Sequence, residues 1–444
     1  MSLKPLSSVL VLSTLLLGAC NPNPAGPGPG SEQTLTLSGT LPTGGKTARV
    51  TVQGLPPVTT DTQGRFRVSG VQIPYTIRVD VPAYLREGET TAVIVEDLTS
   101  SDLAALSSLV QSQFPPESTP TPTPAPQVKG RVIGTLNPFL DANVYLTSTT
   151  NSVSGGQRVN RDFSFEYPVA GLYYDAVPKG PGTLHALQSS GNYTDLVQNY
   201  TAYGKRSVAL PTSGALEGQD IALSPITTQT VRLRATLPVG ARPEIYVSTG
   251  FRTVSTEGGI TLGRGSVKPE TGVTVPVSLP VVAGADYVFT LSASEDSTGP
   301  LYRSSNTGRI LQTLPQTLEL RPLPFLEWLS PGVGQDLAAA VVTVLRWGDG
   351  GGLTLLTLDE SDTLDGFSRR RLFTTVLQKS RFSLADQGFT LKPNTRYDVQ
   401  LIRIGGLPYA SALAFASSNA PAARSWEAGA TDVQYVNLSF KTQP

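Results

Sequence analysis

The chain has 444 residues, and its 34 basic and 34 acidic residues cancel to a formal net charge of zero. Only 15% of the residues are charged, and no basic stripe is present, so nucleic acid is not an expected partner. The 43 glycines and 36 prolines, with plentiful Val, Thr and Leu, predict many short strands and turns spread over several domains.

The beginning of the chain has the pattern of an export signal. A positively charged start precedes an apolar run from Val9 to Leu17, which is too short to span a bilayer as a stable helix. The run ends in Leu17-Gly18-Ala19-Cys20, and this segment resembles the lipobox of bacterial lipoproteins. The resemblance implies a signal peptide over residues 1–19 and leaves Cys20 as a lipidated N-terminus.

Cys20 is the only cysteine of the chain, so it cannot form an intramolecular disulfide. Each acyl methylene buried in a membrane contributes about 0.8 kcal/mol, and several chains together anchor a protein stably. We therefore expect an extracytoplasmic protein held to the cell membrane or the outer membrane by lipid on Cys20. The alternative is an ordinary signal peptide cut near Ala19, with a spare thiol.

Two segments are predicted to be extended spacers. Residues 20–32 contain the lipidated cysteine and a tether, NPNPAGPGPG, that has few side chains to bury. Residues 113–127 contain PPESTPTPTPAP, which favours polyproline II and predicts a semi-rigid linker. Just before this linker, the spacing of apolar residues from Asp102 to Val110 predicts one short helix.

Three related segments are predicted to form β-sandwiches: unit one (33–112), unit two (128–226) and unit three (227–323). Each opens with an alternating run that contains or ends near a Thr-Leu pair, and each continues after eight or nine residues into a second run. The second runs are Val50–Val52, Val144–Leu146 and Ile245–Val247, and the last runs of the units are Ala92–Val95, Asp220–Leu223 and Thr317–Leu320.

Units one and two resemble carboxypeptidase regulatory-like, prealbumin-like domains. The resemblance rests on the opening glycines, Gly39 and Gly130, and on the turn and strand from Thr60 to Phe66 with a weaker counterpart from Asp162 to Phe165. In the first of these turns, Asp61-Thr-Gln-Gly64, we expect the aspartate to accept local backbone hydrogen bonds and the glycine to adopt a positive φ.

Unit four (324–444) has a different pattern. A strand that ends at Trp347, the motif Leu391-Lys-Pro-Asn-Thr-Arg-Tyr397 and a final strand from Val433 to Thr442 resemble a fibronectin type III-like sandwich. The resemblance implies a tyrosine corner, in which the hydroxyl of Tyr397 bonds to upstream backbone. The stretch from Asp349 to Gly388 is longer than usual, so we expect an added loop or hairpin there.

Together these patterns predict an all-β fold of tandem antiparallel β-sandwich domains, Ig-like or prealbumin-like, arranged as beads on a string. They do not predict an enzyme or a cofactor. His185 is the only histidine, and no nucleophile motif accompanies it, so we interpret it as a hydrogen-bonded or partly exposed strand residue. The acidic segment Asp359–Asp365 is interpreted as a solvated loop, with calcium binding left open.

The leading hypothesis is a non-catalytic binding or structural role at the cell envelope, with an envelope protein or polysaccharide as the possible partner besides the membrane. One alternative is a carbohydrate-binding surface protein that uses aromatic residues of unit two, although packing is the better reading of these tyrosines. The other is a hydrolase with its site in the unit four insertion. The tyrosines concerned are Tyr173, Tyr174, Tyr193, Tyr200 and Tyr203.

Overall fold

The computed structural model of the chain is built almost entirely from β-strands, and the predicted all-β class of tandem sandwich domains is confirmed. Cys20 and its tether lie outside the described residues. None of the helical residues that the structure describes forms a candidate membrane-spanning helix. The structure describes residues 34–83, 89–113, 126–134, 136–148, 157–169, 181–190, 195–242, 244–254, 259–267, 274–295, 299–332, 336–338, 344–348, 351–361, 369–408, 412 and 430–443.

Units one, two and three share a pairing scheme. The first strand pairs antiparallel with the strand that follows the predicted turn region, and the second strand pairs with a later strand of the opposite sheet. The elements of unit one are β1 (Thr34–Thr40), β2 (Arg49–Val52), β3 (Val58–Thr59), β4 (Arg65–Gln72), β5 (Tyr75–Pro82), β6 (Thr90–Leu98) and the helix α1 (Ala104–Gln111).

The strands of unit two are β7 (Gln127–Gly134), β8 (Asp141–Ser148), β9 (Gln157–Arg158), β10 (Ser164–Pro168), β11 (Pro181–Ser190), β12 (Asn199–Ala209), β13 (Ala215–Leu216) and β14 (Ile221–Pro225). Those of unit three are β15 (Thr228–Ala235), β16 (Ile245–Arg252), β17 (Ile260–Val267), β18 (Val275–Pro280), β19 (Asp286–Ser294), β20 (Leu301–Leu311) and β21 (Thr317–Leu320). Unit four contains β22 (Trp328–Ser330), β23 (Asp336–Ala338), β24 (Val344–Trp347), β25 (Leu353–Ser361), β26 (Arg369–Leu377), β27 (Arg381–Ser383), β28 (Arg396–Gly405) and β29 (Asp432–Gln443).

The predicted match between the last strands of the units is wrong for unit one. Strands β14 and β21 run parallel to the first strands of their units, β7 and β15. Strand β6 instead pairs with β5. Its structural counterparts are β12, which pairs with β11 in unit two, and β20, which pairs with β19 in unit three. In unit one the predicted helix, α1, lies next to β1, and the hydroxyl of Ser107 donates to the carbonyl of Thr40 at 3.2 Å. The helix thus takes the place of the last strand.

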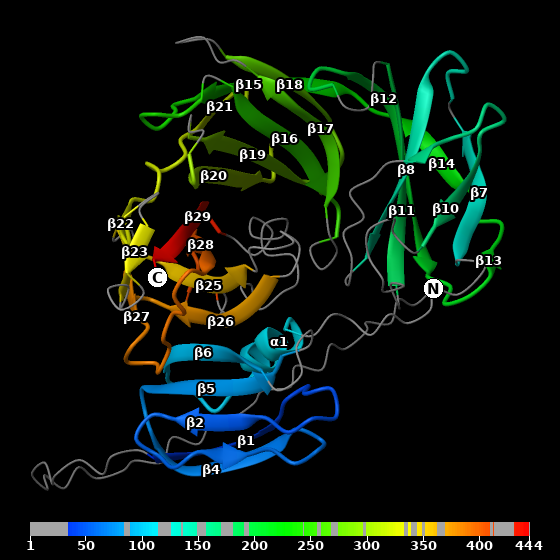
Figure 1. Cartoon of the computed structure of the whole chain (residues 1–444). Helices are drawn as coiled ribbons and strands as arrows, with labels where there is room; N and C mark the ends of the chain where they lie inside the picture. Colours follow the sequence, from blue (N-terminus) through cyan, green and yellow to red (C-terminus); the bar gives the residue numbers. More distant parts are fainter. Residues whose placement is uncertain are drawn as a thin grey trace, which may run out of the picture.

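Units one, three and four are joined by one sheet, so the expectation of separate beads needs correction. The order of this thirteen-stranded sheet is β17-β16-β19-β20-β29-β28-β25-β26-β6-β5-β2-β3, with β23 also paired to β29. Figure 1 shows it running from unit three through unit four to unit one, with unit two to one side. One cross-strand row runs through Ser304, Tyr435, Ile402, Leu355, Val376, Val95, Ile77 and Val52.

The long stretch between the unit four landmarks forms the edge on which unit one docks. The expected hairpin is present as β25 and β26, which pair antiparallel, and the outer edge of β26 pairs in parallel with β6. Strand β6 is buried on both faces, because Val93 and Val95 pack in the core of unit one while Ala92 and Ile94 pack in the core of unit four. The apolar residues of β6 therefore pack in two different cores.

Polar contacts reinforce the junction between units one and four. The guanidinium of Arg78 lies 4.8 Å from the centre of the Phe389 ring and donates to the carbonyl of Gln387. The ammonium of Lys379 lies 2.9 Å from a carboxylate oxygen of Glu96, and this hydrogen bond raises the pKa of the lysine. These contacts surround the parallel strand pair with side chains from both units.

Two local predictions are confirmed. The side chain of Asp61 accepts hydrogen bonds from the backbone N–H groups of Gln63 and Arg65 at 2.9 and 2.8 Å. Gly64 has a φ of 78°, and an added Cβ would lie 1.9 Å from the carbonyl oxygen of Leu41, so only glycine fits.

The predicted tyrosine corner is present in unit four. Tyr397 is buried, and its hydroxyl accepts a 2.7 Å hydrogen bond from the backbone N–H of Lys392. Unit three has a similar contact that the sequence analysis missed, in which the hydroxyl of Tyr287 accepts from the N–H of Val282 at 2.9 Å. The shared five-residue spacing is a signal that could have revealed it.

The shared sheet predicts that units one and four lose stability together. Replacing Ile94 by Ala removes a fully buried side chain from the unit four core, which should lower the free energy of unfolding by about 2–5 kcal/mol. Hydrogen exchange should become faster in β26 as well as in β5. The control is Val239→Ala, because Val239 is 99% exposed. Faster exchange confined to unit one would contradict the shared core.

Candidate functional site

His185 lies in a buried contact between units two and three. It projects from β11 toward unit three, and hydrogen bonds join its Nδ1 to the hydroxyl of Tyr203 at 2.9 Å and its Nε2 to the hydroxyl of Thr147 at 3.1 Å. Phe251 of unit three packs edge-on against both the imidazole and the Tyr203 ring. The hydrogen-bonded interpretation of His185 is therefore confirmed, and the residue is only 1% exposed.

Both faces of the central strands of unit two are covered, which explains why β8 and β11 are buried along almost their whole length. One face belongs to the core of unit two, and the other belongs to a cluster shared with unit three. The unit two members of the shared cluster are Tyr145, Leu187, Tyr200 and Tyr203.

Burial, with a smaller effect from the charge of Lys205, lowers the pKa of His185 from 6.5 to about 3. The imidazole is therefore neutral under physiological conditions, with one nitrogen able to donate and the other to accept. In the described part of the chain, no carboxylate contacts the ring, and the hydroxyls that do are those of a threonine and a tyrosine. The arrangement is that of a buried polar link between two units.

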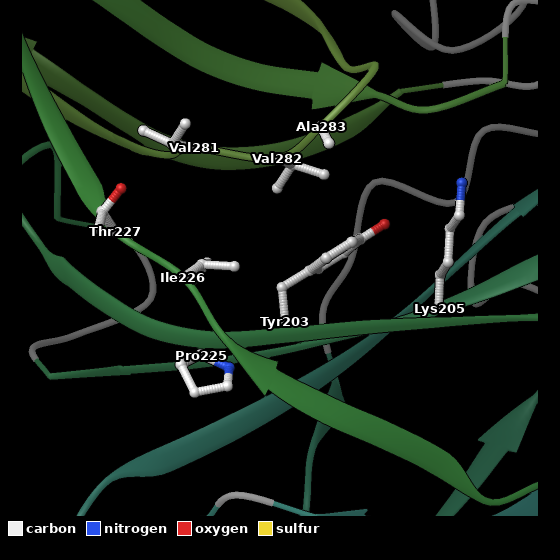
Figure 2. Close-up of a pocket in the computed structure, with 8 residues that line it drawn as sticks. All are labelled: Tyr203, Lys205, Pro225, Ile226, Thr227, Val281, Val282 and Ala283. Atoms are coloured by element: carbon white, nitrogen blue, oxygen red, sulfur yellow. The ribbon is translucent and has the colours of Figure 1, made fainter.

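A pocket of about 540 Å³ opens beside this contact. Figure 2 shows the Tyr203 ring and the Lys205 side chain projecting from β12, facing the segment Val281–Ala283 of unit three. The connection from Pro225 to Thr227 closes another side. Apart from the ammonium of Lys205, the pocket offers few polar groups to orient a ligand, because the Tyr203 hydroxyl already bonds to His185.

A second hollow, the sheet groove, lies on one face of the thirteen-stranded sheet where units three and four join. Its volume is about 330 Å³, and its lining comes from β16, β19, β20 and β29. All of its side chains are uncharged, and most carry a hydroxyl or an amide. They are Tyr246, Thr290, Leu291, Ser292, Ser304, Asn306, Val433 and Tyr435.

The acidic segment predicted as a solvated loop begins within a strand. Asp359 and Glu360 belong to β25. Their cross-strand partners on β26 are Arg371 and Arg370, respectively. The Arg371 guanidinium lies 2.8 Å from the Asp359 carboxylate, while buried Glu360 is 2.8 Å from the ammonium of Lys392. These two carboxylates are neutralised by cations, so the loop interpretation is wrong for them. Residues 362–365 lie outside the described residues.

The structure gathers few of the residues that sequence reasoning considered. Four of them, Cys20, Tyr173, Tyr174 and Tyr193, lie outside the described residues. In the described part, no group of three or more His, Cys, Asp or Glu side chains could hold a metal ion. Tyr200 and Tyr203 pack between units two and three. For these two residues the sequence analysis favoured packing over ligand binding. Trp328 is buried in β22 opposite Trp347.

Sequence reasoning did not identify the sheet groove. Its residues come from three strands of unit three and one strand of unit four, far apart along the chain. The one available signal was a tyrosine at the exposed position of an alternating strand, Ile245-Tyr246-Val247. This signal cannot be interpreted until the neighbouring strands are known.

Comparisons with known proteins do not assign a family. No family model matches the chain, and no curated protein matches it. A DUF3823 family protein from Parabacteroides merdae ATCC 43184 aligns with a TM-score of 0.14 and 13% identity, covering 38% of this chain and 91% of that one. A tetra-tandem repeat in the extending region of a large adhesion protein aligns with a TM-score of 0.13 and 11% identity, covering 83% and 90%. Neither likeness is close enough to support a functional argument.

The buried imidazole predicts a loss of stability in mild acid. The unfolded chain binds a proton at His185 below about pH 6.5, whereas the folded chain does so only near pH 3, so the free energy of unfolding falls as the pH falls between these values. Between pH 7 and pH 5 the wild type should lose about 2 kcal/mol more than His185→Gln. Urea unfolding at both pH values measures the difference. Equal losses in the two proteins would show that the imidazole is not held neutral.

Proposed function

We propose that this protein is a lipid-anchored, extracytoplasmic module with a non-catalytic structural or binding role at the cell envelope. The lipobox-like segment that ends in Cys20 supports anchoring, and the membrane is the partner that the lipid provides. An envelope protein or polysaccharide is the second partner. The neutral overall charge and the uncharged sheet groove do not favour nucleic acid.

The path of the chain is the observation that carries the structural role. Unit one follows the anchor, and the last unit returns to pair with it through β26 and β6. Unit three pairs with the same sheet through β20 and β29. A partner that binds unit three is therefore connected to unit one, next to the anchor, through the backbone hydrogen bonds of one sheet. This connection adds to the covalent one, which includes the linker between units one and two.

Replacement of the proposed lipidated residue tests the anchor. In the host bacterium, the wild type should incorporate radioactive palmitate and sediment with membranes. Cys20→Ala should do neither, because it lacks the thiol that accepts the diacylglyceryl group. Ser31→Ala, a change of similar size in the same segment, serves as the control. A wild type that carries no label would overturn the proposed anchor.

The non-catalytic role is tested with panels of ester, peptide and glycoside substrates. We expect no turnover by the purified chain. Turnover that disappears in Asp362→Asn or Asp365→Asn of the unit four insertion, while urea unfolding at pH 7 stays unchanged, would replace this proposal with the hydrolase hypothesis.

A further inference from the structure

We propose that the sheet groove binds a neutral polysaccharide chain. This inference rests on the binding role proposed above and specifies its partner, but it does not depend on lipid attachment. It is also distinct from a carbohydrate site on unit two, because the unit two tyrosines of the shared cluster, such as Tyr200 and Tyr203, are buried against unit three.

Strand register brings the groove residues together. One cross-strand row contains Tyr246, Ser292, Asn306 and Val433, and the next contains Ser294, Ser304 and Tyr435. Neighbouring strands lie about 4.8 Å apart, so Tyr246 and Tyr435 stand roughly 14 Å apart across the sheet. Side chains along this span can contact several consecutive sugar units of one chain.

The chemistry of the lining matches a ligand that is rich in hydroxyl groups and carries no charge. In the described part of the chain, the hydroxyls of Tyr246, Ser292 and Tyr435 have no hydrogen-bond partner. The amide of Asn306 donates to the carbonyl of Val433 at 3.1 Å, which directs its own carbonyl oxygen elsewhere as an acceptor. Burial raises the pKa of Tyr435 to about 12, so this hydroxyl stays neutral and able to donate.

Aromatic surface is available at the groove without any rearrangement. Tyr246 is 42% exposed, and Tyr302, which lies on the same face of β20 as the groove residues, is 40% exposed. The hydroxyl of Tyr302 is hydrogen-bonded to that of Ser294 at 2.9 Å, which fixes the position of the ring. A fixed phenol ring can pack against the apolar face of a sugar while its hydroxyl remains in a polar contact.

The groove is also held rigidly by its backbone. Strands β20 and β29 pair antiparallel from Leu301↔Leu438 to Thr307↔Asp432, so the boundary between units three and four is a continuous ladder. The opposite face of the sheet is packed in the cores of these units. A groove that is formed before the ligand arrives loses less conformational entropy on binding.

The uncharged lining distinguishes this groove from the pocket beside His185. The pocket has Lys205 at its edge, which would favour an anion. The groove has no charged side chain among its described lining residues, so an anionic polymer would lose hydration there without gaining an ion pair. Neutral polysaccharides are therefore the ligand class that fits best.

Co-sedimentation of the full chain, purified in detergent, with insoluble cellulose, chitin, xylan and mannan tests the proposal. Retention on at least one of these neutral polymers is expected, and it should fall at least tenfold in Tyr246→Ala and in Ser292→Glu. Phe139→Ala is the matched control, because it removes an aromatic ring that is 94% exposed on unit two. Thermal unfolding of each variant shows that the fold is intact.

Two results would overturn the proposal. The first is no retention on any of the four polymers, and the second is retention that both groove variants preserve. If Tyr246→Ala fails to fold, Tyr302→Ala and Ser292→Glu provide the same comparison from two other strands.

Discussion

The arrangement of the molecule depends on backbone hydrogen bonds between two strand edges, β6 of unit one and β26 of unit four. An unpaired edge exposes a row of N–H and C=O groups that can pair with any other strand. Here the hairpin of β25 and β26 extends the unit four sheet by two strands, and β6 pairs with its outer edge. Each unit thereby covers an edge of the other, and units one and four, which are far apart along the chain, become neighbours.

This pairing has a consequence for the cores. A strand at a junction presents one face to each of two units, so it is apolar on both faces. Strand β6 divides its side chains between two cores in this way, and β11 divides its side chains between the core of unit two and the cluster shared with unit three. The junctions are therefore packed interiors, which limits the relative motion of the units.

Both hollows described above lie where units meet. The pocket beside His185 is bounded by β12 of unit two and by Val281–Ala283 of unit three, and the sheet groove is formed by strands of units three and four. A small sandwich fills its own interior with side chains, so concave surface arises mainly where two sandwiches join at an angle. Both hollows therefore depend on how neighbouring units join.

The local structure could be predicted from the sequence alone. The turn from Asp61 to Gly64, the helix before the linker, the tyrosine corner at Tyr397 and the alternating strands all follow from interactions within a few residues. Tyr287 could have been added, since its contact with Val282 has the spacing of Tyr397 and Lys392. The acidic pair Asp359 and Glu360 was misread because its arginine partners follow about ten residues later, across a hairpin whose register was unknown.

The choice of which strand edges pair depends on contacts between residues that are far apart along the chain. Backbone hydrogen bonds are nearly the same for every sequence, so alternation predicts a strand and its buried face but not its neighbour. For this reason the sequence repeat matched β6 with β14 and β21, which are not its structural counterparts. The cross-strand row from Ser304 to Val52 could not be predicted either. The sheet groove was equally hidden, because its tyrosines, serines and asparagine become one surface only when β16, β19, β20 and β29 are in register.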